Sequence, residues 1–143
     1  MMFLLDTNVI SELRKAGDGR ADANVVVWLS SVEAATLYVS AITLLELELG
    51  VLLMERRDPS QGGRLRAWMN QYVLPEFSER VLPVDSTIAL RCAHLHVPNP
   101  CAERDALIAA TALVHGMTIV TRNLVDFERL DVALLNPWES ARP

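Results

Sequence analysis

The chain has 143 residues, of which 51% are hydrophobic, and this size fits one domain with an apolar core. No apolar run approaches the roughly 20 residues that a membrane-spanning helix needs, and no basic flank or cleavage motif marks the N-terminus as a signal peptide. We therefore expect a cytoplasmic protein with no membrane partner. The net charge of −5 excludes bulk electrostatics as a means of attracting nucleic acid, so an anionic substrate would need local arginines or a bound cation.

Strands and helices alternate along the predicted order of elements. In the first half we expect, in chain order, a strand over residues 2–5, a helix over 7–15, a helix over 21–32, a strand over 36–40 and a helix over 43–57. In the second half we expect a helix over 62–77, a strand over 80–84, a helix over 85–96, a helix over 103–115, a strand over 117–121, a helical turn over 126–130 and a strand over 132–135. This alternation predicts a three-layer α/β fold with a central, mainly parallel sheet.

Acidic residues fall at or just beyond the ends of several predicted strands. Asp6 closes the first strand, Glu46 lies about one turn into the helix after the second, and Asp105 lies in the first turn of the helix that leads to the fourth. The fourth strand ends in Thr121-Arg122-Asn123, and Asp126 follows. Because the carboxyl ends of parallel strands share one edge of the sheet, we expect these side chains to converge in one crevice.

Each acidic residue also has a purely structural interpretation. Asp6 and Asp105 could simply cap helices or favour the helix dipole. The helix of Glu46 carries leucines on all sides, which predicts that it is buried and that its carboxylate needs a partner or a metal. Glu48 lies about 200° around the helix from Glu46, so the two face different directions, and periodicity does not choose between them. Gly50, one turn beyond Glu46, could leave space beside the carboxylate or allow close helix packing.

Clustered carboxylates repel one another unless a cation joins them. Lys15 is the only lysine, so a divalent ion that prefers oxygen ligands, Mg²⁺ or Mn²⁺, is the natural counter-charge. Such an ion can polarise a phosphoryl oxygen and activate water. Other residue types point elsewhere. Cys92 and Cys101 lack the spacing of a zinc site and make no disulfide framework, and we interpret the three histidines as surface or core residues rather than ligands: His94, His96 and His115.

Four segments in order along nearly the whole chain resemble PIN-domain ribonucleases, and in particular the VapC and FitB-like toxins of bacterial toxin–antitoxin pairs. They are LLDTNVISEL, SAITLLELELGV, DALIAATAL with TIVTRN, and LLNPW. The resemblance implies a PIN-like α/β/α sandwich over residues 1–143 as a single domain. It also implies Mg²⁺- or Mn²⁺-dependent hydrolysis of RNA, a homodimer, and a VapB/FitA-like antitoxin that blocks the site in a larger heteromer.

The resemblance assigns the metal ligands and catalytic acids to Asp6, Glu46 and Asp105. It also implies hydrogen-bonding support from five polar residues: Thr7, Asn8, Ser40, Thr43 and Thr121. The fourth family acid often follows the sequence Thr-Arg, where this chain has Asn123. Asn123 is therefore a further catalytic candidate, Asp126 is its alternative, and either one metal or two could bind.

Two other phosphate chemistries fit poorly. A phosphoacceptor receiver domain needs a lysine after a late strand, but Lys15 lies in the first helix; a haloacid-dehalogenase phosphatase needs a second aspartate where Asn8 stands. The remaining alternative is a catalytically weak or inactive PIN-fold binding module that acts through its antitoxin, a possibility that Asn123 raises. Basic residues beside the strand ends could contact RNA or be solvated surface: Arg14, Lys15, Arg104 and Arg122.

Overall fold

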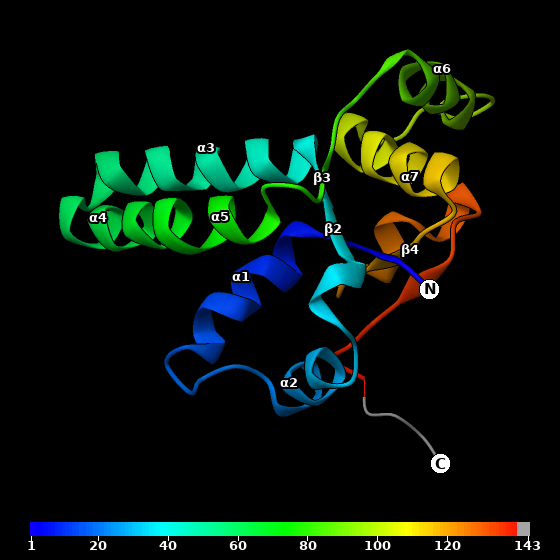
Figure 1. The fold of residues 1–143 in the computed structure, drawn as a ribbon. Helices are drawn as coiled ribbons and strands as arrows, with labels where there is room; N and C mark the ends of the chain where they lie inside the picture. Colours follow the sequence, from blue (N-terminus) through cyan, green and yellow to red (C-terminus); the bar gives the residue numbers. More distant parts are fainter. Residues whose placement is uncertain (140–143) are drawn as a thin grey trace.

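Five short strands form one sheet in the order β3-β2-β1-β4-β5, and every neighbouring pair is parallel (Figure 1). The computed structural model describes residues 1–139; residues 140–143 of the predicted domain lie outside the described residues. The strands are β1 (Phe3–Leu5), β2 (Leu37–Ser40), β3 (Val81–Leu82), β4 (Thr118–Val120) and β5 (Leu134–Leu135). The predicted parallel sheet is confirmed.

Seven α-helices within residues 1–139 surround the sheet. They are α1 (Thr7–Ala16), α2 (Ala23–Ser30), α3 (Ala41–Arg57), α4 (Pro59–Trp68), α5 (Leu74–Phe77), α6 (Ser86–Leu95) and α7 (Glu103–His115). Short 3₁₀ turns cover Ala34–Thr36, Leu124–Asp126 and Glu128–Leu130. None of the helices in the described part of the chain has both the length and the apolar character to span a membrane.

Alternate residues of the central strand separate two apolar layers. Phe3 and Leu5 of β1 pack on one face with residues of α1, α3 and α5, whereas Leu4 packs on the other face with α7. The first layer includes Ile10, Val51 and Phe77, all of them buried. In Figure 1, α3 lies beside α4 and α5 at one end of the molecule, and α6 lies beside α7 at the other. The three-layer α/β/α prediction is therefore confirmed.

The helix predicted over residues 62–77 begins earlier and has an irregular centre. It starts at Pro59, because proline at the first helical position loses no hydrogen bond and the Asp58 side chain accepts from the backbone N–H groups of Ser60 and Gln61. A π-helical turn over Met69–Val73 joins α4 to α5. Gly62, where the helix was predicted to begin, and Gly63 therefore lie inside α4.

The prediction that α3 is buried on all sides is wrong for this chain alone. Leu47 and Val51 face the core, but Leu45 is 47% exposed. Three further leucines of α3 are exposed too: Leu49, Leu52 and Leu53. The helix contacts α4 and α7 on only some of its sides. The leucines on its remaining sides form an exposed leucine surface, which consists of Leu45, Leu49, Leu52 and Leu53. Burial of the helix is therefore not what demands a partner for Glu46.

Gly62 marks the closest approach of α4 to α3. A Cβ at this position would overlap the Cα of Glu55 and lie 2.6 Å from its backbone nitrogen, whereas a Cβ at Gly63 would meet nothing within 4 Å. We expect Gly62→Ala to lower the free energy of unfolding by about 1–3 kcal/mol through overpacking. Gly63→Ala should raise it by up to about 1 kcal/mol through helix propensity. Urea denaturation measures both, and equal stabilisation by the two variants would contradict the close packing.

Candidate active site

A cleft of about 370 Å³ lies at the carboxyl ends of the central strands. Its lining comes from segments far apart in the chain: Asp6, Thr7, Asn8, Glu46, Asp105, Asn123 and Asp126. The structure thus brings together every candidate catalytic and metal-binding residue that the sequence analysis named. Asn123 and Asp126 were alternatives for the fourth position of the site, and the side chains of both line the cleft.

Asp6 joins the end of β1 to the start of α1 and is only 7% exposed. Its Oδ1 accepts a hydrogen bond of 2.8 Å from the backbone N–H of Thr7. Its Oδ2 accepts from Thr121 Oγ1 at 2.8 Å and from Asn8 Nδ2 at 3.4 Å. Asp6 therefore both caps a helix and lines the cleft, because Oδ1 accepts from the start of α1 while Oδ2 accepts from Thr121, directly after β4, and from Asn8 of α1.

The pKa of Asp6 is raised from its ordinary value. Burial is the largest cause, and the negative charges of Glu46 and Asp126 add to it. The hydrogen bonds from Thr121 and Thr7 oppose this rise because they favour the charged carboxylate. Hydrogen-bond donors thus hold the Asp6 carboxylate in position, but too little positive charge lies nearby to offset the energetic cost of burying it.

Of the two glutamates on α3, Glu46 reaches the cleft and Glu48 does not. Glu46 Oε1 accepts a hydrogen bond of 2.7 Å from Thr7 Oγ1, and its Oε2 lies 3.8 Å from Arg104 Nη1 on α7. Glu48 instead forms a bidentate pair with Arg66 of α4, with two contacts of 2.8 Å that lower the pKa of Glu48. Gly50 has open space around it beside Glu46, so it leaves room there rather than serving close helix packing.

Asp105 lies in the first turn of α7, but it does not cap the helix. The N-cap residue is Ala102, and within residues 1–139 no side chain or backbone group hydrogen-bonds to the Asp105 carboxylate. The pKa of Asp105 is raised to about 6, first by burial and then by the negative charges of Asp126, Asp6 and Glu46. Three neighbouring carboxylates therefore disfavour the ionisation of Asp105.

Thr121 connects the two sides of the cleft. Its Oγ1 donates to Asp6 and accepts from the backbone N–H of Asn123 at 3.0 Å and from Asn8 Nδ2 at 3.3 Å. Asn8 Oδ1 in turn accepts from the backbone N–H of Arg122 at 3.2 Å. The expected hydrogen-bonding support is present for Thr7, Asn8 and Thr121.

That support is absent for the other two polar residues. Ser40 Oγ accepts from the backbone N–H of Ile42 and so caps α3. Thr43 Oγ1 is buried and has no hydrogen-bond partner among the described residues. The expectation that Ser40 and Thr43 hydrogen-bond to the acidic residues is therefore not met, because the tight start of α3 directs Ser40 to its own backbone.

Little positive charge offsets the cleft within residues 1–139. Arg104 forms an ion pair with Glu46, a contact that was not predicted because the two residues come from different helices. Lys15 pairs with Glu12 at 3.4 Å, and the Arg122 guanidinium lies 5.3 Å from the centre of the Trp138 ring. The cleft thus presents a carboxylate-rich set of oxygen donors, which is the set that Mg²⁺ and Mn²⁺ prefer.

Comparisons with known proteins agree along nearly the whole chain. Residues 3–133 match the family described as PIN domain. The chain is 41% identical to "Toxin FitB" of Neisseria gonorrhoeae, over 96% of this chain and 99% of that protein. It is 38% identical to "VapC ribonuclease Y4jK" of Sinorhizobium fredii, over 98% of this chain and 100% of that protein. The crystal structure of FitAcB from Neisseria gonorrhoeae superposes with a TM-score of 0.86 at 38% identity, covering 96% of this chain and 99% of that one.

Proposed function

Because this chain belongs to the PIN domain family, we propose that it is the toxin of a toxin–antitoxin pair and that it hydrolyses RNA phosphodiester bonds. Two relatives support this assignment by name, one as a toxin and the other as a VapC ribonuclease. The observation that carries the proposal is the cleft in which Asp6, Glu46, Asp105 and Asp126 meet, with Arg104 paired to Glu46.

PIN-domain ribonucleases generally use a divalent metal, and the donor set of this cleft fits one. We assign the binding of Mg²⁺ or Mn²⁺ to Asp6, Glu46 and Asp105, and Asn123 and Asp126 line the same cleft. The raised pKa values of Asp6 and Asp105 support this, since both carboxylates would be stabilised by an added positive charge. Such an ion would supply positive charge beside the phosphodiester and lower the pKa of water, so that hydroxide is available to attack the phosphorus.

The surrounding residues orient the carboxylates. Thr121 and the backbone of Thr7 hold the two oxygens of Asp6, and the Thr7 hydroxyl holds one oxygen of Glu46. Arg104 contacts the other oxygen of Glu46 and is itself half exposed, so its guanidinium can also reach the phosphate backbone of RNA. These contacts fix the acidic groups before substrate arrives, which avoids the cost of reorganising them during the reaction.

Cleavage of a labelled RNA by the purified chain tests this proposal. We expect cleavage in Mg²⁺ or Mn²⁺, its loss in excess EDTA, and its recovery when the metal is added back. Cleavage that persists in EDTA would rule out the metal-dependent mechanism. RNA incubated without any protein, under the same metal conditions, controls for spontaneous hydrolysis.

The alternative of a weak or inactive binding module rests on Asn123, an uncharged residue in the cleft wall. Asp126 supplies a carboxylate to the same wall, which supports the enzyme over the binding module. If the chain were inactive for want of a fourth acid, Asn123→Asp would create cleavage that the unmodified chain lacks. We expect instead that the unmodified chain cleaves RNA and that Asp126→Asn reduces its rate.

We further propose that residues 1–143 form one domain that acts in the cytoplasm as a homodimer and is neutralised there by an antitoxin. Cys92 and Cys101 are free thiols, as the reducing cytoplasm favours. The exposed leucine surface of α3 supports association with a second chain, because apolar patches of this kind mark protein interfaces.

A further inference from the structure

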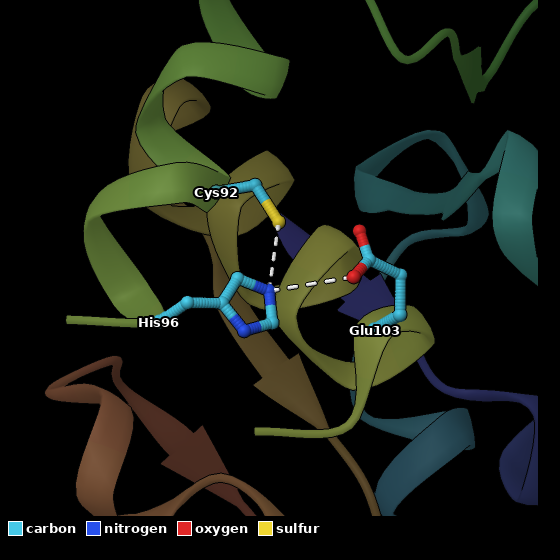
Figure 2. A group of neighbouring side chains, drawn as sticks. All are labelled: Cys92, His96 and Glu103. Carbon is cyan, nitrogen blue, oxygen red and sulfur yellow. Dashed lines mark hydrogen bonds and ion pairs between the residues drawn. The ribbon is translucent and has the colours of Figure 1, made fainter. Parts of the chain in front are cut away.

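A second group of metal-binding side chains lies away from the carboxylate cleft, where the end of α6 meets the start of α7. It consists of Cys92, His96 and Glu103, which point toward one another (Figure 2). Cys92 Sγ lies 3.8 Å from His96 Nε2, and the same nitrogen lies 3.6 Å from Glu103 Oε2. All three donor atoms lie within 4.8 Å of one another.

The helices explain why these residues meet. Cys92 and His96 are four residues apart at the end of α6, so they lie on one face of the chain. Glu103 is the first residue of α7, which packs beside α6. In a tetrahedral zinc site, metal–ligand distances of roughly 2.0–2.3 Å put neighbouring donor atoms about 3.3–3.6 Å apart. The observed spacing needs only small side-chain adjustments to reach that arrangement.

We propose that Cys92, His96 and Glu103 bind a Zn²⁺ ion, with water in the fourth position. The ligand atoms of this site differ from those of the carboxylate cleft, so the two sites prefer different metal ions. A thiolate and an imidazole favour a borderline-soft ion such as Zn²⁺, whereas the oxygen-only cleft favours Mg²⁺ or Mn²⁺. The inference does not depend on the proposed ribonuclease activity.

The burial of Cys92 supports a ligand rather than a surface thiol. Cys92 is 3% exposed, and within residues 1–139 His96 is the polar group that its sulfur contacts. Glu103 is exposed and His96 is partly exposed, so an ion can enter from solvent on their side. Burial raises the pKa of the Cys92 thiol, so it is neutral without a metal and loses its proton on binding one.

Cys101 has a positioning role on the other side of the imidazole ring. Its backbone N–H donates to His96 Nδ1 at 3.3 Å, and its Sγ lies 3.7 Å from the same nitrogen. Without a metal, this bond places the ring proton on Nε2; an ion on Nε2 moves the proton to Nδ1, which then donates to the Cys101 sulfur instead of accepting from the Cys101 N–H. Such outer partners orient metal-binding histidines in proteins generally.

A metal at this place would fix the first turn of α7 to the end of α6. Arg104 and Asp105, which follow Glu103 directly, both face the carboxylate cleft. The proposed zinc site would therefore stabilise the segment that presents these two residues, without itself contacting RNA.

Cobalt substitution tests the site directly, since a Co²⁺–thiolate bond gives a charge-transfer absorption that carboxylate ligands do not. The full chain, freed of metal and kept reduced without added thiols, is titrated with Co²⁺ and then with Zn²⁺. We expect the absorption to appear with one equivalent of Co²⁺ and to disappear when Zn²⁺ displaces it. Absence of the absorption in the unmodified chain would overturn the proposal.

Variants separate the ligands from their neighbours. Cys92→Ser and His96→Gln should lose the absorption, whereas Cys101→Ser and Asp105→Asn should keep it. Loss in Cys101→Ser with retention in Cys92→Ser would overturn the assignment of the ligands.

A thermal measurement guards against misfolded variants. Zn²⁺ should raise the Tm of the unmodified chain and of Cys101→Ser, but not that of His96→Gln, whose side chain is partly exposed and tolerates substitution. An equal rise in His96→Gln would likewise refute the site.

Discussion

Asp105→Asn should lower the rate of RNA cleavage by about 10³-fold or more. A divalent ion contributes several kcal/mol to the stabilisation of charge in such reactions, and each 1.36 kcal/mol corresponds to a factor of ten in rate. Within the described residues 1–139 Asp105 has no hydrogen bond that the substitution would break, so the change removes one negative charge and leaves the local structure in place. Single-turnover cleavage of a labelled RNA at saturating Mg²⁺ measures the effect.

Asp85→Asn is the matched control for this loss. Asp85 also stands at a helix start, where its side chain accepts from the backbone N–H of Ile88, but it lies outside the cleft. Asparagine caps helices about as well as aspartate, so we expect a cleavage rate within about twofold of the unmodified chain. If Asp105→Asn retained full activity, or if Asp85→Asn lost as much, the acidic cleft would not be the catalytic site.

Asp105→Asn should also stabilise the folded chain when metal is absent. The pKa of Asp105 rises from 3.8 to about 6 on folding, so the unfolded chain loses this proton first as pH increases. The contribution of Asp105 to stability therefore falls between about pH 4 and pH 6 and remains unfavourable above that range. In EDTA at pH 7 we expect Asp105→Asn to have a higher Tm than the unmodified chain, and the difference should vanish below about pH 4.

Added Mg²⁺ should reduce this difference in Tm. The ion binds the folded unmodified chain through all three carboxylates and raises its Tm more than that of Asp105→Asn, which lacks one of them. A helix-dipole role predicts the opposite sign, since an acidic residue in the first turn of a helix is favourable by about 0.3–1 kcal/mol. A lower Tm for Asp105→Asn in EDTA at pH 7 would thus identify Asp105 as a structural residue. Thermal melts followed by circular dichroism at several pH values distinguish the two.

The sheet was predictable from sequence because its strands are short apolar runs separated by helices of clear periodicity. The position of the site followed from the same pattern, since parallel strands end at one edge and Asp6 closes the first of them. The start of α4 was less predictable. Pro59 reads as a terminator after α3, yet it begins the next helix because Asp58 caps it.

Periodicity alone did not choose between Glu46 and Glu48, and the family resemblance assigned the role to Glu46. In the structure Glu46 lines the cleft, whereas Glu48 pairs with Arg66 of another helix. The exposure of the α3 leucines was likewise not predicted, because an apolar stretch of sequence does not distinguish a buried helix face from an exposed one.

The proposed zinc ligands were also beyond sequence reasoning. From the sequence, His96 is one of three scattered histidines interpreted as surface or core residues, and the spacing of Cys92 and Cys101 fits no zinc site. The structure instead groups His96 with Cys92 and with a glutamate from the next helix, across a loop whose path no local pattern specifies.

Manganese binding followed by electron paramagnetic resonance tests the central claim most directly, since free Mn²⁺ gives a strong signal that diminishes when the ion is bound. The unmodified chain should take up Mn²⁺, and Cys92→Ser should do so equally because its thiol lies outside the cleft. The triple variant Asp6→Asn, Glu46→Gln, Asp105→Asn should take up none at the same concentrations while remaining folded. Undiminished uptake by the triple variant, or no uptake by the unmodified chain, would contradict a metal held by these three carboxylates.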